Sequence, residues 1–373
     1  MGAELPAFAV LGAGAVVTAR HLPALRAIGG RVLSVFDPAG DAAQTAADSF
    51  QIPLVAKTFE EAIAAEGVDA VLIASPNSYH REQAEHAFAL GRHVLCEKPL
   101  ALTLEDANAI SVAAARAQRV LQVGFHHRFS AEQLCVKGLL RHEVLGEVRA
   151  FSGSISEPLE TVPGGVQNYR FDAKQGGGFT LIDLGQHRLD QMRDLLGEFS
   201  SVSCEMASVL DSHNIDDSVA LNLKMESGAI GSLGWHRFSR AFTSPLMLYG
   251  TKATLGCSAF ITGPFQSAPV SVYLEGTPES VLPPEMLAWT RPAKWWGGLE
   301  AGWIDLWPPR QNTFEEQFRS FFRAVSTGGA PVAGGGDGFK AVEIVQGAYR
   351  SFRERRSITL PLEDLEHEPP PRW

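Results

Sequence analysis

The sequence predicts an α/β domain with a doubly wound parallel sheet, followed by an α+β domain with a large open, mostly antiparallel sheet. Three observations support this prediction. The chain has 373 residues, which is enough for two domains of ordinary size. Short apolar runs alternate with helical patterns over residues 1–125, whereas strand candidates follow one another directly in much of residues 126–373. We therefore expect the domains to meet between residues 125 and 126.

The strands of the first domain are expected as short, continuous apolar runs. Runs without polar alternation are typical of strands that are buried on both faces of a parallel sheet. They occur at Ala7–Leu11, Val32–Phe36, Ala70–Ala74, His93–Cys96 and Val120–Gly124. Helical patterns separate them at Ala15–Ile28, Ala42–Ser49, Thr58–Glu66, Ser78–Leu90 and Leu104–Gln118. This alternation builds βαβ units and so predicts the doubly wound sheet.

The second domain is expected to begin with a helix at Ser130–Arg141 and to contain another over Phe179–Leu196. Its strands are expected at Val148–Glu157, Ser201–Ala207, Ser218–Met225, Ile230–Phe238, Pro245–Gly250 and Val270–Glu275. Turn signals between these strands indicate antiparallel pairing. The Pro- and Trp-rich stretch 283–309 is interpreted as a surface excursion. Helices return at Phe314–Ser326 and Phe339–Arg353, on either side of a Gly-rich loop at Gly334–Gly338.

Composition excludes several classes of protein. The formal net charge is −10, from 32 basic and 42 acidic residues, and nucleic-acid binding needs a basic surface. The 4 cysteines are widely spaced and contain no C-x-x-C pair for zinc or redox chemistry. No apolar run approaches the roughly 20 residues of a membrane span, and the N-terminus lacks the basic region of a signal peptide. We therefore expect a cytoplasmic protein without nucleic-acid or membrane partners.

The first motif, G-A-G-A-V-V, follows the first expected strand and opens the first helix. Gly12 allows a tight turn, and Gly14 lets a pyrophosphate approach the backbone. Ala15 and Val16 begin a helix whose N-terminus carries partial positive charge, which favours an anion. Val17 stands where the full dinucleotide fingerprint has a third small residue. The glycines also fit a purely structural turn, but their place in the first βα unit favours cofactor binding.

Asp37 ends the second expected strand, about 20 residues after the glycines, where a carboxylate accepts hydrogen bonds from an adenosine ribose. Its charge would repel a 2′-phosphate, and no Arg follows it directly. Asp37 therefore predicts NAD in preference to NADP. The alternative interpretation is a helix N-cap, a common position for Asp.

Two polar segments follow neighbouring strands of the expected sheet, at the carboxyl ends where ligands of such sheets lie. One segment is S-P-N-S-Y-H and the other is E-K-P. The residues that we assign from them to the cofactor site are Ser75, Pro76, Asn77, His80, Glu97 and Lys98. The competing interpretations are a helix cap for Asn77, a surface histidine for His80 and a surface salt bridge for E-K-P.

A third set of polar residues lies on an expected helix of the second domain. Asp183, His187 and Asp190 are spaced by four and three residues, which places them on one face of an α-helix. An Asp-x-x-x-His pair can orient or polarise an imidazole for proton transfer. A metal site is the alternative, but a third His or Cys at ligand spacing is missing, so we assign no metal. Apolar neighbours such as Leu181 and Leu184 disfavour a solvated polar face.

Together these motifs resemble the glucose–fructose oxidoreductase/inositol dehydrogenase family (Gfo/Idh/MocA). They are G-A-G-A-V-V, S-P-N-S-Y-H, C-E-K-P-L, V-G-F-H-H-R-F, G-G-G-F-T-L-I-D-L-G-Q-H-R-L-D and D-G-F-K-A-V-E-I-V-Q-G-A-Y-R-S. Their order and spacing cover nearly the whole chain. The resemblance implies a Rossmann domain that binds NAD and a sugar or polyol substrate. It also implies an open sheet that packs between the subunits of a homodimer or homotetramer.

The resemblance implies roles for single residues. Lys98 matches the lysine beside the nicotinamide and substrate, and His187 matches the usual acid/base residue. Asp183 would bind a substrate hydroxyl and orient the imidazole. His126 and His127 occupy positions that vary between members, so no substrate contact is carried over to them. The substrate site implied by the matches consists of Lys98, Arg128, Asp183 and His187.

We expect reversible hydride transfer between NAD and a hydroxyl-bearing carbon of a sugar, polyol or sugar derivative. Either His187 or Lys98 takes the hydroxyl proton, and the sequence leaves these two roles interchangeable. Two other classes stay open. One is a redox-neutral enzyme that uses NAD transiently to cleave a glycosidic bond or to epimerise. The other is a non-catalytic sensor of NAD or sugar, which ranks third because both Lys98 and His187 are present.

Overall fold

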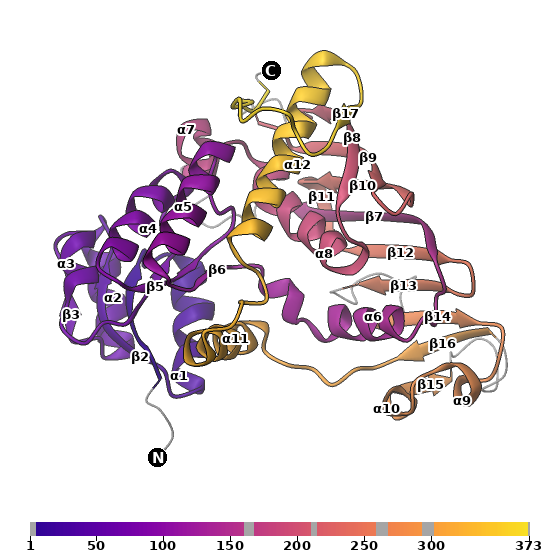
Figure 1. The fold of residues 1–373 in the computed structure, drawn as a ribbon, viewed down its shortest axis with the longest axis horizontal. Helices are drawn as coiled ribbons and strands as arrows, with labels where there is room; N and C mark the ends of the chain where they lie inside the picture. The colour runs from indigo at the N-terminus through magenta and orange to yellow at the C-terminus, as the bar shows by residue number, and fades with distance from the viewer. Residues whose placement is uncertain (1–4, 160–167, 210–214, 259–267, 293–301, 372–373) are drawn as a thin grey trace.

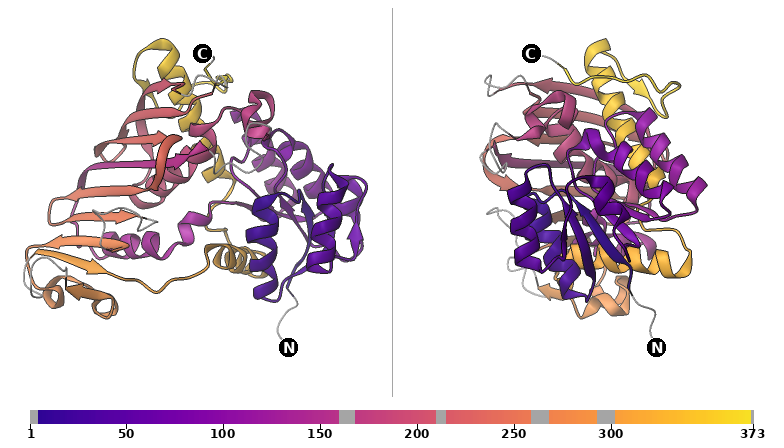
Figure 2. Two further views of the ribbon diagram at one scale, coloured as in Figure 1. Left: turned by 180° about the vertical axis from the view of Figure 1, so that it is seen from behind. Right: turned by 90° about the vertical axis from the view of Figure 1, so that its left-hand side faces the viewer.

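The computed structural model describes residues 5–159, 168–209, 215–258, 268–292 and 302–371. Two sheets lie side by side, with several helices between them (Figure 1). The first sheet comes entirely from the N-terminal part of the chain, and the second comes from the remainder. Figure 2 shows the second sheet as a broad, twisted layer whose helices lie on the side of the first domain.

The first sheet has six parallel strands in the order β3-β2-β1-β4-β5-β6. They are β1 (Ala7–Leu11), β2 (Arg31–Phe36), β3 (Leu54–Val55), β4 (Ala70–Ile73), β5 (His93–Cys96) and β6 (Leu121–Val123). The helices of this domain are α1 (Leu22–Ala27), α2 (Gly40–Phe50), α3 (Phe59–Ala64), α4 (His80–Ala89) and α5 (Leu104–Ala117). The predicted doubly wound sheet is confirmed. Its order reverses between β1 and β4, and ligands of such sheets bind in the crevice at that point.

The second sheet has eleven strands and is mostly antiparallel, as predicted. Its strands are β7 (Val148–Pro158), β8 (Phe199–Ala207), β9 (Ser218–Met225), β10 (Ile230–His236), β11 (Phe238–Thr243), β12 (Pro245–Gly250), β13 (Thr254–Ser258), β14 (Val270–Leu274), β15 (Thr290–Pro292), β16 (Gly302–Leu306) and β17 (Ile358–Thr359). One strand pair, β7 with β10, is parallel. The expected surface excursion at 283–309 is wrong where it is described, because β16 pairs with β14 and buries Ile304 and Leu306. Residues 293–301 of that stretch lie outside the described residues.

Helices cover one face of the second sheet. They are α6 (Ala131–Arg141), α8 (Gln186–Leu196) and α12 (Gly335–Glu354), and they lie between the two sheets in Figure 1. On the other face, Ile230, Tyr249 and Tyr273 are 59%, 41% and 42% exposed. These three residues belong to one cross-strand row, since Ala150 pairs with both Ile230 and Tyr249, and Thr254 pairs with both Tyr249 and Tyr273. This row therefore forms a partly apolar strip on the outer face.

The remaining helices are short, except for α11. They are α7 (Ala173–Gly176), α9 (Pro278–Val281), α10 (Pro284–Leu287) and α11 (Thr313–Thr327). Although α11 comes late in the sequence, it packs on the first domain, where Phe318 and Phe321 lie 5.6 Å from the ring of Phe8. The core of the first domain thus includes residues from a helix that lies far beyond residue 125 in the sequence. The division between residues 125 and 126 stays a prediction.

The Gly-rich segment 334–338 belongs to a helix and not to the expected loop. Helix α12 begins at Gly335, and the Asp337 side chain accepts a hydrogen bond from the Gly334 amide. A Cβ atom at Gly338 would lie 2.7 Å from Leu100, and one at Gly335 would lie 2.4 Å from Ser111. The glycines therefore allow α12 to pack closely against the first domain. Their low helix propensity led to the expectation of a loop and does not show this packing.

Arg128 holds this part of the fold together. Its guanidinium donates two hydrogen bonds to Asp190, at 2.8 and 2.6 Å, and a third of 2.7 Å to Asp337. It also donates to the carbonyl of Val332, and its side chain is only 6% exposed. Arg128 thus joins α8 to α12. Its predicted contact with a substrate stays a prediction.

We predict that Arg128→Ala lowers the free energy of unfolding by about 3–5 kcal/mol, because the buried carboxylate of Asp190 would lose both of its hydrogen bonds from Arg128 and keep only a longer contact with Arg193. Urea denaturation followed by circular dichroism measures this change. Arg149→Ala is the matched control: its pair with Glu147 is exposed, so a change within about 1 kcal/mol is expected. Equal effects of the two substitutions would contradict the structural role of Arg128.

Candidate active site

A cavity of about 240 Å³ lies between the two domains, at the carboxyl ends of β4 and β5. Residues from the first domain and from the second domain face one another across it. It is lined by Val16, Ala74, Ser75, Asn77, Glu97, Lys98, His126, Glu157, Tyr169, Arg170, Asp183, Leu184, His187 and Arg237. The fold therefore brings together sequence segments that the motifs singled out separately.

The two glycines of the first motif differ in their surroundings. Gly12 has φ +99°, and a Cβ atom there would lie 2.6 Å from the carbonyl oxygen of Ala74, so the tight turn requires glycine. A Cβ atom at Gly14 would meet nothing within 4 Å. Gly14 is exposed, as are Ala15 and Val16 at the start of the helix. This leaves open space directly over a helix N-terminus, where a phosphate group fits.

Asp37 lies beside this turn. Its carboxylate accepts hydrogen bonds from the backbone amides of Ala13, at 2.7 Å, and Ala39, at 2.8 Å. The side chain thus ties the end of β2 to the Gly-rich turn and stays partly exposed. The open space at Gly14 fits the pyrophosphate of a dinucleotide, and the carboxylate of Asp37 beside it fits the ribose. The assignment of individual residues to that cofactor stays a prediction.

His80 is fully buried, so its alternative interpretation as a surface histidine is wrong. Its Nδ1 lies 3.0 Å from the carbonyl oxygen of Pro99, and its Nε2 lies 3.0 Å from that of Ser75. The ring therefore connects the loop after β4 to the loop after β5. His80 does not line the cavity itself and fixes the two segments that do.

Several neighbouring residues hold the same two loops. The Ser75 hydroxyl donates to Gln83, and the Asn77 amide donates to the carbonyl of Gly176 in the second domain. Glu97 contacts His21 Nε2 at 2.7 Å, and it is not part of a surface salt bridge. Pro76 precedes the short 3₁₀ turn Asn77–Tyr79. These contacts position Lys98 at the end of β5.

Lys98 and Asp183 form the centre of the cavity. Lys98 Nζ donates to Asp183 Oδ1 at 2.7 Å and to the Asp183 carbonyl at 2.9 Å. The second carboxylate oxygen, Oδ2, lies 2.8 Å from Arg237 and 3.1 Å from Arg170. Glu157 accepts a hydrogen bond of 2.6 Å from Arg237. One carboxylate from the second domain therefore holds three cations, one of which comes from the first domain.

The charge state of Asp183 follows from these contacts. Burial alone raises the pKa of a carboxyl group, but the positive charges of Arg170, Lys98 and Arg237 outweigh burial and hold the pKa of Asp183 well below its usual range. Asp183 is consequently a carboxylate at neutral pH.

The helix that carries Asp183 is not a regular α-helix, which the sequence did not predict. Thr180–Gly185 forms a π-helical turn, and α8 begins directly after it. The carboxylate of Asp216 accepts hydrogen bonds from the amides of Phe179 and Leu181, at 2.8 and 2.9 Å, and so holds the start of this turn. Wide turns of this kind are frequent at functional sites. Here it places Asp183 toward Lys98, and no hydrogen bond joins Asp183 to His187 among the described residues.

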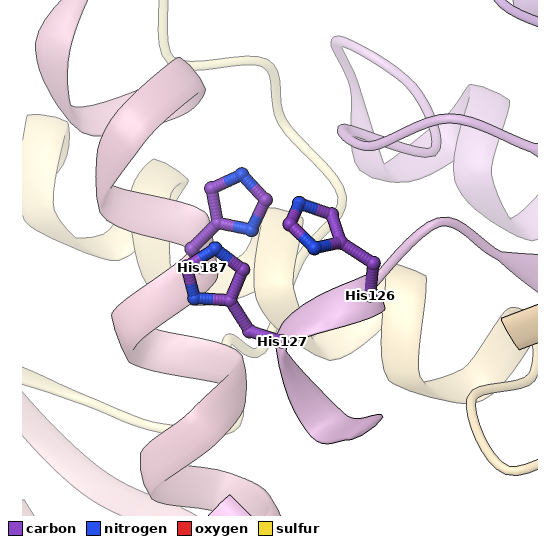
Figure 3. A group of neighbouring side chains, drawn as sticks. All are labelled: His126, His127 and His187. Carbon is purple, nitrogen blue, oxygen red and sulfur yellow. The ribbon is translucent and has the colours of Figure 1, made fainter. Parts of the chain in front are cut away.

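His187 lies with two other histidines. Its ring is stacked on His127, with centroids 4.4 Å apart, and lies 5.2 Å from the ring of His126 (Figure 3). Burial, followed by the positive charges of Lys98 and the two other histidines, lowers the pKa of His187 well below 6.5. His187 is therefore a neutral imidazole that can accept a proton.

Some lining residues had no motif in the sequence. Glu157 is the penultimate residue of β7, Tyr169 and Arg170 lie in a short 3₁₀ turn, and Arg237 follows β10. They are scattered over about 80 residues and carry no common spacing. Only strand pairing between β7 and β10 brings Glu157 and Arg237 together. Asp190, predicted on the same helix face as His187, instead lies in the buried contact with Arg128.

Two family models match the chain. The model described as "Oxidoreductase family, NAD-binding Rossmann fold" covers residues 7–125, and the model of the GFO/IDH/MocA C-terminal domain covers residues 134–256. The chain belongs to the Gfo/Idh/MocA oxidoreductase family. Among the described residues, no helix is long and apolar enough to cross a membrane.

Curated relatives of this family member are sugar and polyol oxidoreductases. A 1,5-anhydro-D-fructose reductase of Ensifer adhaerens is 28% identical over 66% of this chain and 74% of its own length. A D-apiose dehydrogenase of Paraburkholderia graminis is 27% identical over 94% and 88%. An inositol 2-dehydrogenase of Rhizobium meliloti is 24% identical over 95% and 98%. Another relative, of Haloarcula marismortui, is a D-xylose 1-dehydrogenase that uses NADP⁺.

Solved structures show the same fold. A levoglucosan dehydrogenase in complex with NADH has a TM-score of 0.81 at 20% identity and covers 96% of this chain and 100% of that one. An aldose-aldose oxidoreductase from Caulobacter crescentus, in complex with glycerol, has a TM-score of 0.79 at 24% identity with the same coverage. At identities below 25%, these TM-scores show that the chain shares the architecture of both structures over nearly its whole length.

We predict that Gly14→Ala folds normally but weakens NADH binding by about tenfold or more, because its methyl group fills the space over the helix N-terminus. Fluorescence titration with NADH and thermal unfolding measure the two properties. Gly12→Ala is the comparison: its Cβ meets Ala74, so it is expected to lower thermal stability as well. Unchanged NADH affinity in Gly14→Ala would remove this residue from the cofactor site.

Proposed function

We propose that this protein is an NAD-dependent dehydrogenase that transfers a hydride between the nicotinamide and a hydroxyl-bearing carbon of a sugar, polyol or sugar derivative. The observation that carries the proposal is the ion pair of Lys98 with Asp183 in a cavity that also contains His187. The family membership and the sugar-oxidoreductase relatives support the same class of reaction.

NAD, when bound, supplies the hydride acceptor. In this proposal Gly12, Gly14, Ala15, Val16 and Asp37 hold the pyrophosphate and the adenosine ribose. The loop residues that complete the cofactor site are Ser75, Pro76, Asn77, His80, Glu97 and Lys98. His80 contributes through the two carbonyls that it holds and not by direct contact.

The contacts of Lys98 favour one of the two proton-transfer schemes. Lys98 donates two hydrogen bonds to Asp183 and is thereby held as a donor in the cavity. In this scheme Lys98 donates a further hydrogen bond to the substrate oxygen and stabilises negative charge there. His187 is neutral and can take the hydroxyl proton. Asp183 orients Lys98 and remains close enough to the cavity to accept a substrate hydroxyl.

The outer face of the second sheet supports a homodimer or homotetramer. Its row of Ile230, Tyr249 and Tyr273 leaves apolar side chains exposed on a broad surface, and such surfaces often mark protein contacts. We propose that this face packs against a second copy of the chain, as the resemblance implies. Sedimentation of the purified protein measures the number of subunits.

The function is tested by following NADH absorbance while a panel of sugars and polyols is added with NAD. A substrate-dependent rise is expected, and Lys98→Met is expected to lower kcat by about 10²–10³-fold, because a donor to the reacting oxygen is lost. NADH titration of the variant checks that the cofactor still binds. Lys57→Met, at an exposed lysine, is the control and keeps the parent rate. A kcat close to that of the parent in Lys98→Met would contradict the assignment of Lys98 to the active site.

The preference for NAD over NADP is tested with Asp37→Asn, which keeps an oxygen for the Ala13 amide and removes the charge. We predict that the ratio of kcat/KM for NAD to that for NADP falls by about tenfold or more, since a charged hydrogen bond is worth about 1.5–3 kcal/mol. Asp41→Asn, an exposed carboxylate in the first turn of α2, should leave the ratio unchanged. An unaltered ratio in Asp37→Asn would remove Asp37 from the ribose.

A further inference from the structure

Three histidines from two separate segments meet beside the cavity. His126 and His127 lie in the 3₁₀ turn His126–Phe129 after β6, and His187 lies in the first turn of α8. One ring nitrogen from each residue can be chosen so that all three lie within 4.8 Å of one another. Figure 3 shows the three rings grouped around a common space. We call this set the histidine cluster.

One nitrogen atom of the histidine cluster has no protein partner in the described part of the chain. Nδ1 of His187 is buried and has no hydrogen-bond partner among the described residues. Nδ1 of His126 makes only a long contact, 3.3 Å, to the hydroxyl of Thr313. A buried polar atom without a partner is unfavourable, and in a native structure it is explained by a water molecule, an ion or a catalytic role. The position of this nitrogen within the cluster is consistent with a ligand that binds imidazoles.

The three side chains of the cluster are imidazoles, and the neutral form of an imidazole offers a lone pair for coordination. Lys98 repels a cation from this region, but its ion pair with Asp183 offsets part of that repulsion.

We propose that His126, His127 and His187 form a binding site for one divalent transition-metal ion of the Zn²⁺ class. Three imidazoles with an open fourth position are a ligand set that Zn²⁺ accepts, whereas Mg²⁺ and Ca²⁺ prefer oxygen atoms. Bonds of about 2.0–2.1 Å in a tetrahedral arrangement place nitrogens roughly 3.4 Å apart. Metal binding would therefore shorten the distances between the ring nitrogens, which lie up to 4.8 Å apart. Side-chain rotation achieves this, and it separates the stacked rings of His127 and His187.

Metal binding would block the proton acceptor of the proposed dehydrogenase, and this consequence rests on the proposed function. A metal ion on the imidazole of His187 takes up a lone pair and opposes protonation of the ring. The histidine cluster then acts as an inhibitory site, and chelation reverses the inhibition. The metal ion is a reversible ligand in this scheme and takes no part in the hydride transfer.

The first experiment measures metal binding by the full, untagged chain after dialysis against EDTA. Calorimetric titration with ZnCl₂ is expected to give one site per chain, and Co²⁺ is expected to give the visible absorption of a tetrahedral ion. His127→Ala and His126→Ala should each weaken Zn²⁺ binding by about tenfold or more, because each removes one ligand. His142→Ala, at an exposed histidine outside the cluster, is the control and binds Zn²⁺ as the parent does.

Equal Zn²⁺ affinity in the parent and in both cluster variants overturns the site, and so does a parent chain that binds no Zn²⁺ at millimolar concentration. Thermal unfolding shows which variants fold, and if only one of them folds, its Zn²⁺ affinity alone is compared with that of the parent. The inhibition assay is separate. A chain that binds Zn²⁺ but has no dehydrogenase activity contradicts the proposed function and supports the site. An active enzyme that binds Zn²⁺ without losing rate contradicts the inhibitory role.

Discussion

The carboxylate of Asp183 is the group on which the arrangement of the cavity depends. It pairs with Lys98 from the first domain and with Arg170 and Arg237 from the second. Without it, three cations would share one partly enclosed space, where their mutual repulsion is weakly screened. The same interaction orients the lysine and joins the domains across the cavity. The arrangement of the cavity and the contact between the domains therefore depend on the same side chain.

The surrounding fold makes this interaction possible by fixing both partners. His80 holds the loops that flank Lys98 through two backbone carbonyls. On the opposite side, Asp216 caps the π-helical turn that carries Asp183. Neither residue needs to touch a substrate for the site to depend on it. Buried polar groups of this kind are costly unless they are fully paired, so their bonds restrict the backbone to one arrangement.

The two domains are linked by packing as well as by charge. Helix α11 returns to the first sheet and contributes Phe318 and Phe321 to its core. Helix α12 approaches Leu100 through Gly338, and Arg128 ties α12 to α8. The second sheet uses its inner face for this packing and keeps its outer row exposed. The outer row is therefore accessible, while the cavity lies between the two domains.

The sequence by itself determined the doubly wound sheet, the antiparallel character of the second sheet and the main segments of the cavity. The sheets follow from the local periodicity of apolar residues. The cavity segments follow from short motifs such as Gly12-x-Gly14, in which all the residues that matter are close together in the sequence. It did not show the π-helical turn at Asp183, the helical start at Gly335 or the buried role of Arg128. Each depends on contacts between residues that are distant in the sequence. Only the tertiary structure showed that His187 lies beside His126 and His127, and that Arg237 lies beside Glu157. The separation of these residues along the sequence does not indicate that they are in contact.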